Sequence, residues 1–424
     1  MKKSDSAESR IVAFGNALSE PFSRRVFMQL AAAAGITGAI GLPGAGARAA
    51  EADIRRGKII YQIDVLHSYW VEWVKGFDAT TRALGLEGAQ MLHGSDPATQ
   101  ISQVRSAPQL GAKMFIGLPF PDGAVPQIAR VLQQAGIYYS NVWEQPAWFS
   151  PVDVGDYYVQ YSTPNSMLAG YEVARVLFEK IGGEGKVVHI LGLPTPTDAF
   201  RTAGVQKAAA EFPGIQLVGN LRTKWDRESG RDAMLSMITA HPDLKAVMAQ
   251  NDSIAEGVLA VLDERGLKNI PVGGIDGLPD GLRSVLSGRL AATHSSLPPY
   301  QAAFMVTSVF DALNGWKPTL PERMMYTESA LITADNAQLY LDRLYGPQGA
   351  EYDWSKMSRT LNPETWDPQA RILPIDPQKH FALFPENRAR LNPAYSEAAA
   401  PAEFERVTRL YADHYRTGPF KAKA

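Results

Sequence analysis

The sequence predicts an α/β protein made of two lobes, each built on a doubly wound parallel sheet. Two observations lead to this prediction. From residue 58 to about residue 326, short apolar runs alternate with amphipathic helical stretches, and such alternation implies parallel sheets covered by helices on both faces. The alternating series also occurs twice, with the second series beginning after STPNS at 162–166. Each series is long enough for a sheet of its own.

The elements follow in chain order. In the first helical stretch Trp70, Val74 and Phe77 fall on one face, which is the period of a helix packed against a core. The first series predicts strands at 58–65, 112–118 and 137–142, with helices from Trp70 onwards and at 124–136. The second series predicts helices at 171–185, 199–214, 231–243, 254–266 and 281–289, with strands at 186–193, 215–221, 244–250 and 269–276.

The first 49 residues have the features of an export signal. Arg24 and Arg25 are adjacent and precede an uncharged run at 26–42 that is rich in glycine and alanine and is a poor membrane span. A small-residue cleavage pattern ends at Ala49. This arrangement is typical of a twin-arginine signal, so we expect a periplasmic protein cleaved near Ala49. The alternative is an N-terminal tail with two chance arginines.

Composition and charge exclude several classes of function. The net charge of −2 provides no basic field for nucleic acid. The absence of cysteine excludes disulfides, thiolate metal sites and a cysteine nucleophile. The histidines show no metal-site spacing, and no nucleophile elbow, phosphate loop or dinucleotide fingerprint occurs. We therefore expect no metal, no cofactor and no nucleic-acid partner.

Polar residues at the ends of the second lobe's strands are the candidate binding residues, because open parallel sheets bind ligands at the carboxyl ends of their strands. An arginine donates a planar pair of hydrogen bonds, a carboxylate accepts from hydroxyl groups, and a tryptophan covers the apolar face of a sugar ring. The set therefore suits a small neutral polyhydroxylated molecule. Its members are Asp198, Arg201, Trp225, Asn251, Asp252 and Asp276.

Each of these residues also has a structural interpretation. Ser253 followed by Glu256 matches a capping box, which would account for Ser253 or Asp252 but not for Asn251. Asp276 fits a turn, and Arg201 fits an exposed helix surface. Because all of them fall at strand ends of one lobe, we favour binding.

The motifs AFRTAGV, KWDRESG, AVMAQNDSIAEG and VGGIDGLPDGLRSVLSGRLAATHSSLP resemble, in this order, those of the periplasmic sugar-binding proteins of the ribose- and galactose-binding family. The resemblance covers residues 58 to about 325 and implies a type I periplasmic binding fold, whose lobes close around a sugar across three hinge crossings. It implies that the second lobe's ligand contacts are Arg201, Trp225, Asn251 and Asp276. Asn251 would face the ligand while Asp252 and Ser253 begin the helix behind it.

The first lobe departs from the ribose pattern. Tyr69 and Trp70 match the family's aromatic pair, but His67 replaces the usual asparagine. After Asn141, the chain has Val142, Trp143 and Glu144 where ribose binders have Asp-Arg, and Ser296 stands where they use glutamine. The resemblance makes these residues first-lobe contacts, and we expect a small sugar, polyol or sugar derivative other than ribose. The first-lobe and hinge contacts predicted are His67, Tyr69, Trp70, Asn141, Trp143, Glu144 and Ser296.

The resemblance also sets the expected organisation. The first lobe comprises 57–161 and 297–325, and the second comprises 162–296 and 326–333. A C-terminal extension, mostly irregular and helical, runs from 334 to 424. We expect this arm to wrap the lobes and to end in a docking helix, in which Phe404, Val407 and Tyr411 lie near one face; the alternative is a platform for a protein partner. Hinge crossings are expected near 161–164, 293–296 and 324–325. We expect a monomer that captures its ligand and delivers it to the permease of an ABC importer. A periplasmic ligand sensor for a receptor or histidine kinase is the alternative. A sugar-modifying enzyme with His67 and Glu144 as an acid–base pair is less favoured.

Overall fold

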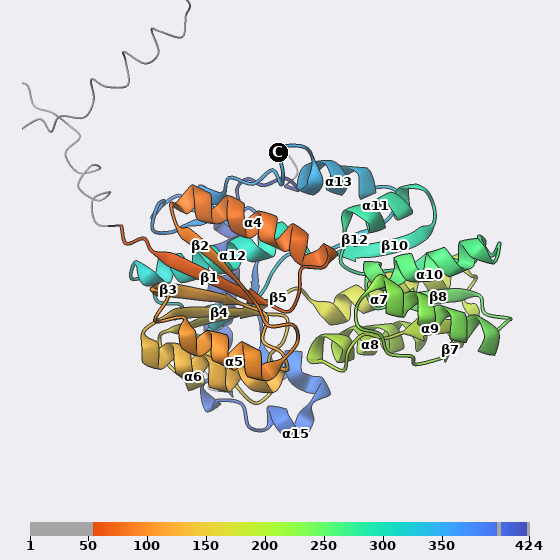
Figure 1. The fold of residues 1–424 in the computed structure, drawn as a ribbon, viewed down its shortest axis with the longest axis horizontal. Coiled ribbons are helices and arrows are strands. Elements are labelled where there is room, and N and C mark those ends of the chain that lie inside the picture. Colours follow the sequence, from red (N-terminus) through yellow and green to blue (C-terminus); the bar gives the residue numbers. More distant parts are fainter. Residues whose placement is uncertain (1–53, 397–399, 422–424) are drawn as a thin grey trace, which may run out of the picture. The chain divides into compact units, whose positions relative to one another are not determined.

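Two parallel sheets form the core of the protein in a computed structural model that describes residues 54–396 and 400–421 (Figure 1). The predicted export signal at 1–49 lies outside these residues. The first sheet has seven strands in the order β13-β11-β5-β4-β3-β1-β2, and the second has six in the order β12-β10-β9-β8-β6-β7. The predicted fold class, two parallel-sheet α/β lobes, is confirmed.

The first sheet is parallel except for its last strand, β13 (Leu373–Pro374), which pairs antiparallel with β11. Successive residues of β1 point to opposite faces. Ile59 and Tyr61 pack under helices α4 and α12, while Ile60 packs on the side of α5 and α6. The elements are β1 (Lys58–Ile63), α4 (Ser68–Leu84), β2 (Glu87–Leu92), α5 (Pro97–Ser106), β3 (Ala112–Gly117), α6 (Val125–Ala135), β4 (Tyr138–Val142), β5 (Tyr158–Thr163), α12 (Pro298–Leu313) and β11 (Met324–Tyr326).

The second sheet is covered on both faces in the same way. Val187 packs with α7 and α8, and Val188 packs with α9, α10 and α11. Only β12 runs antiparallel to its neighbour, β10. The elements are α7 (Ser166–Lys180), β6 (Glu184–Ile190), α8 (Pro196–Ala209), β7 (Gly214–Val218), α9 (Arg227–Ala240), β8 (Ala246–Ala249), α10 (Asp252–Glu264), β9 (Val272–Gly273), α11 (Pro279–Leu286), β10 (Leu290–Ser295) and β12 (Ala330–Ile332).

The chain passes between the two sheets three times. It leaves β5 of the first sheet for α7, returns from β10 to α12, and leaves β11 for β12. The third passage begins after Tyr326, slightly later than the sequence suggests, because Met324–Tyr326 pairs with β5 as part of the first sheet. These passages place the carboxyl ends of both sheets' strands toward one another.

The C-terminal segment, residues 334–396 and 400–421, packs against both lobes. Helix α13 (Ala337–Tyr345) contacts α11 of the second lobe, as Figure 1 shows, and the Tyr345 hydroxyl donates to the Gly277 carbonyl over 2.9 Å. On the first lobe, Asp311 of α12 accepts from the Ser358 hydroxyl over 2.6 Å and from the Arg359 amide over 2.9 Å. The segment ends with α14 (Pro377–His380), α15 (Pro385–Arg388) and α16 (Ala400–His414).

None of the helices within the described residues is both long and apolar enough to cross a membrane.

Candidate functional site

A small cavity of about 90 Å³ lies between the strand ends of the two lobes. Nine of the eleven residues predicted as ligand contacts line it, so the structure brings together side chains that are up to 209 positions apart, from His67 to Asp276. Their contacts with a ligand remain predictions. The lining residues are Asp64, His67, Tyr69, Trp70, Leu118, Trp143, Glu144, Thr197, Arg201, Trp225, Asn251 and Asp276.

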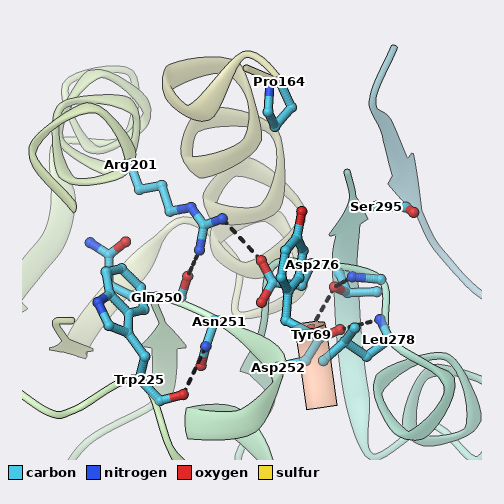
Figure 2. A network of polar contacts seen from close by, with 12 residues as sticks. Tyr69, Pro164, Arg201, Trp225, Gln250, Asn251, Asp252, Asp276, Leu278 and Ser295 are labelled. Atoms are coloured by element: carbon cyan, nitrogen blue, oxygen red, sulfur yellow. Dashed lines mark hydrogen bonds and ion pairs between the residues drawn. The ribbon is translucent and has the colours of Figure 1, made fainter. Parts of the chain in front are cut away.

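Arg201 of α8 is the most firmly held cation of the cavity (Figure 2). One terminal nitrogen, Nη1, donates to the Gln250 carbonyl over 2.6 Å, and Nη2 donates to Asp276 Oδ1 over 3.0 Å. Its guanidinium carbon lies 5.3 Å from the ring centre of Trp143 and 5.5 Å from that of Trp225. The side chain is thus fixed in one orientation, and its charge is matched by Asp276.

Asp276 lies three residues after the end of β9, and a backbone hydrogen bond fixes its position. Its amide donates to the His294 carbonyl over 2.9 Å, and its φ of 127° lies in the left-handed half of the map. Burial raises the pKa of Asp276 to about 6, although the nearby Arg201 acts in the opposite direction. The carboxyl group therefore faces the cavity as a buried acceptor whose ionisation depends on its arginine partner.

Trp143 and Trp225 also have strained backbones, each with a φ of 66°. For a bulky residue this conformation is unfavourable and persists only where the surroundings enforce it. The Trp225 ring lies directly against Gly192, since a Cβ atom at that glycine would lie 2.1 Å from the Cζ2 atom of the ring. The two tryptophans are therefore held as fixed walls of the cavity.

Asn251 caps helix α10, which corrects the expected capping box at Ser253 and Glu256. Its Oδ1 accepts from the Ile254 amide over 2.8 Å, and its Nδ2 donates to the Trp225 carbonyl over 3.0 Å. An N-cap side chain satisfies an unpaired amide of the first turn. Asn251 therefore has a structural task, joining α10 to the Trp225 loop, in addition to lining the cavity (Figure 2).

Asp252 does not line the cavity but lies behind it. Its Oδ2 accepts from the Leu278 amide over 2.8 Å and its Oδ1 from the Thr293 hydroxyl over 2.6 Å. Burial raises the pKa of Asp252 to about 7, with Asp276 adding to the effect. This carboxyl group ties α10 to the loop that carries Asp276. Asp198, also a candidate, instead bonds Arg222 over 2.8 Å and the Gly192 amide over 3.0 Å.

The first lobe contributes an aromatic wall and an imidazole. The Tyr69 hydroxyl donates to Gln301 Oε1 over 2.6 Å, and its ring meets those of Trp70 and Trp143 edge to face. His67 has extended backbone at the start of α4, where its side chain makes no cap bond. Its Nδ1 is buried without a hydrogen-bond partner, and burial lowers its pKa against the influence of Asp64.

Glu144 connects the lobes. Its Oε2 accepts from the Thr197 amide over 3.4 Å, at the start of α8 in the second lobe. Burial raises the pKa of Glu144 to about 7, while the hydrogen bond from the Thr197 amide acts against the rise. A carboxylate at a helix N-terminus is favoured by the exposed amides there. Within the described residues, no hydrogen bond or ion pair joins Glu144 to His67 as an acid–base pair.

Asn141 and Ser296 are the two predicted contacts that are not among the lining residues. Asn141 is fully buried and supports the turn before the cavity, because its Nδ2 donates to the Glu144 carbonyl and its Oδ1 accepts from the Tyr158 hydroxyl. Ser296 lies at the second hinge passage, where its amide donates to the Asp276 carbonyl over 3.3 Å.

Sequence reasoning missed three lining residues, Asp64, Leu118 and Thr197. Asp64 and Leu118 directly follow strands β1 and β3, but the predicted strands at 58–65 and 112–118 contained both residues, so neither was counted as a strand-end residue. Thr197 lies in the first turn of α8 and has no such signal. No group of three or more His, Asp or Glu side chains among the described residues is arranged to hold a metal ion.

Comparison with known proteins identifies the class. Residues 63–317 match the family described as periplasmic binding protein domain. The match covers more than half of the chain, and the chain belongs to this family.

Individual relatives agree with this membership. The chain is 32% identical to a xylitol-binding protein of Mycolicibacterium smegmatis over 268 residues, which is 62% of this chain and 73% of that protein. It is 30% identical to the ribose import binding protein of Escherichia coli over 224 residues, which is 53% of this chain and 73% of that protein. A crystal structure of a twin-arginine translocation pathway signal protein from Burkholderia phytofirmans superimposes with a TM-score of 0.66 at 25% identity, covering 70% of this chain and 94% of that one. These relatives are binding or exported proteins, and none is named as an enzyme.

Proposed function

We propose that the protein is a periplasmic substrate-binding protein that captures a small sugar or polyol between its lobes and delivers it to an ABC importer. The observation that carries the proposal is the cavity itself. It is lined by residues of both lobes and combines two fixed tryptophan rings with buried carboxyl groups and an oriented arginine. Rings cover apolar C–H faces, and the polar groups bond hydroxyls.

A small polyol is the ligand class we favour. The cavity of about 90 Å³ is well below the several hundred Å³ of sites for larger ligands. One relative is named for xylitol and another for ribose. The first lobe of this chain has Trp143 and Glu144 where ribose binders have Asp-Arg, so a polyol or a sugar other than ribose fits it better.

The proposed location and partner follow from the family. The twin-arginine pattern at residues 24–25 and the name of the Burkholderia phytofirmans neighbour support folding before export to the periplasm. Closure of two lobes on a ligand shifts the protein toward one conformation, which a membrane permease can recognise. We propose that the protein acts as a monomer and has no catalytic role.

Thermal unfolding against a panel of pentoses, hexoses, polyols and sugar acids tests the proposal. A ligand at 100 times its dissociation constant adds about 2.7 kcal/mol to the free energy of unfolding, which raises Tm by a few degrees in a chain of this size. Arg201→Ala should abolish the shift, because it removes the guanidinium between the two rings and leaves Asp276 unpaired. Asp280→Asn, a change at an exposed carboxylate, is the control and should keep the shift.

Two results would count against the proposal. A panel in which no sugar or polyol shifts Tm would contradict the ligand class. Conversion of a bound compound during prolonged incubation would contradict a purely binding role. Neighbouring genes for a permease and ATPase would support import, whereas a neighbouring histidine kinase would support sensing.

A further inference from the structure

We propose that Asp64 makes the first-lobe end of the cavity selective for hydrogen-bond donors, so that the site takes neutral and amino-substituted polyols and rejects sugar acids and sugar phosphates. This inference rests on the proposed function, since it names the chemical class of ligand for the same cavity.

Asp64 faces the cavity without a cation of its own. Its Oδ1 is buried and has no hydrogen-bond partner, and its Oδ2 lies 4.0 Å from Nε2 of His67. In the part of the chain that the structure describes, no lysine or arginine forms an ion pair with it. A carboxylate oxygen accepts hydrogen bonds, and burying one such oxygen without a partner is costly. A ligand group placed beside it must therefore be a donor, either a hydroxyl or an ammonium.

The histidines near Asp64 do not neutralise it. Burial lowers the pKa of His67 and of His93, which favours their uncharged forms. The ring of His93 is also fully engaged, because its Nδ1 accepts from the Ser95 amide and its Nε2 faces the Leu118 carbonyl at 3.3 Å. Asp64 is not a helix cap either, since α4 begins at His67 with no side-chain cap bond. The carboxylate thus has no structural partner that would account for its position.

Arg201 already has an acidic partner of its own. Nη1 and Nη2 each donate one bond, to Gln250 and to Asp276, while Nε has no partner. Its charge is matched by Asp276 at 3.0 Å. An anionic ligand group placed beside Asp64 would meet a carboxylate that has no lysine or arginine partner among the described residues, and like charges placed together oppose binding. A ligand ammonium group would instead be attracted to Asp64.

Titration calorimetry with three matched compounds tests the inference: xylitol, xylonate and 1-amino-1-deoxyxylitol. For the unaltered protein we expect xylonate to bind at least about tenfold more weakly than xylitol, a difference of about 1.4 kcal/mol, and the amine to bind at least as well as xylitol. Asp64→Asn keeps the size of the side chain but removes its charge. It should weaken the amine about tenfold or more relative to xylitol and narrow the gap between xylonate and xylitol.

The controls separate this inference from the proposed function. Asp280→Asn makes the same change of charge on an exposed residue of α11 and should leave all three affinities unchanged. Asp64→Ser repeats the comparison if the asparagine variant does not fold, as judged by thermal unfolding without ligand. Equal effects of Asp64→Asn on all three compounds, or a preference of the unaltered protein for xylonate, would overturn the selectivity while polyol binding stands. Absence of binding by every sugar and polyol would instead overturn the proposed function, and this inference with it.

Discussion

Replacing Gly192 by alanine should displace the Trp225 ring and weaken ligand binding. A Cβ atom at this position would lie 2.1 Å from Cζ2, 2.2 Å from Cε2 and 2.3 Å from Cη2 of the ring. Carbon atoms pack best at about 3.5–4.0 Å, so the ring must move by about 1.5 Å. Gly192 follows the end of β6, whose position in the sheet is fixed on both sides by β7 and β8. The ring, rather than the strand, should therefore move.

The size of the effect follows from the cost of overpacking. Inserting a methyl group into a filled site costs about 1–3 kcal/mol. If this cost falls on the ligand-bound form, where the ring must lie in place, affinity drops by about 5- to 150-fold. The ligand-free protein can accommodate part of the shift, because Trp225 is only partly buried. Its Tm should therefore change less than the affinity does.

Calorimetric titration of the ligand found in the panel measures the effect, with tryptophan fluorescence as a second readout. Gly123→Ala is the matched control, because a Cβ atom there has no neighbour within 4 Å. An unchanged dissociation constant for Gly192→Ala, with unchanged fluorescence, would show that the Trp225 ring is not a wall of the ligand site.

Two further predictions concern stability. Burial raises the pKa of Asp252 from its ordinary 3.8 to about 7, so the folded protein binds more protons than the unfolded chain between about pH 4 and pH 7. The free energy of unfolding should then fall as pH rises through this window. Asp252→Asn should make this free energy, measured by urea unfolding at several pH values, depend less on pH; an unchanged pH dependence would refute the assignment to Asp252. Phe200 is buried against His380, Phe381 and Phe384 of the C-terminal segment. Phe200→Ala should lower the free energy of unfolding by about 3–5 kcal/mol, as measured with urea. Leu383→Ala, at a residue that is 40% exposed, should lower it by less than about 0.5 kcal/mol. Equal losses would argue against packing of the C-terminal segment on Phe200.

The alternation of apolar runs and helical periods predicted the two lobes because both signals are local. In β1 the alternation of Ile59 and Ile60 between the two faces follows directly from the strand period. The sequence also predicted that Arg201, Trp225 and Asp276 lie together, because the carboxyl ends of neighbouring parallel strands meet at one edge of a sheet. All three line one cavity in the structure.

Assignments that depend on a single residue were less predictable. Asn251, Asp252 and Ser253 are all good N-cap residues, and the sequence does not show at which of them the helix begins. In the structure Asn251 is the N-cap residue. Its side-chain Oδ1 accepts from the Ile254 amide, and its side-chain Nδ2 is held by the Trp225 carbonyl. Similarly, the role of Glu144 depends on the start of α8, 53 residues further along the chain.

The C-terminal segment shows a different limit. Its last stretch has the helical period that becomes α16, but the path of the rest depends on distant contacts. Arg359, for example, lies over the rings of Trp316, Trp366 and Tyr411 and pairs with Glu322 at 2.7 Å. Such contacts combine residues far apart in sequence, so no local pattern predicts them.

That segment has a consequence for the speed of ligand exchange. It bonds Gly277 of the second lobe through Tyr345 and Asp311 of the first lobe through Ser358, so we expect lobe separation to strain contacts that lie outside the cavity. Each such contact lowers the population of the open form and raises the barrier to opening. We expect both association and release to be slow and to share one opening step, so that the residence time of the ligand reports on residues that never touch it.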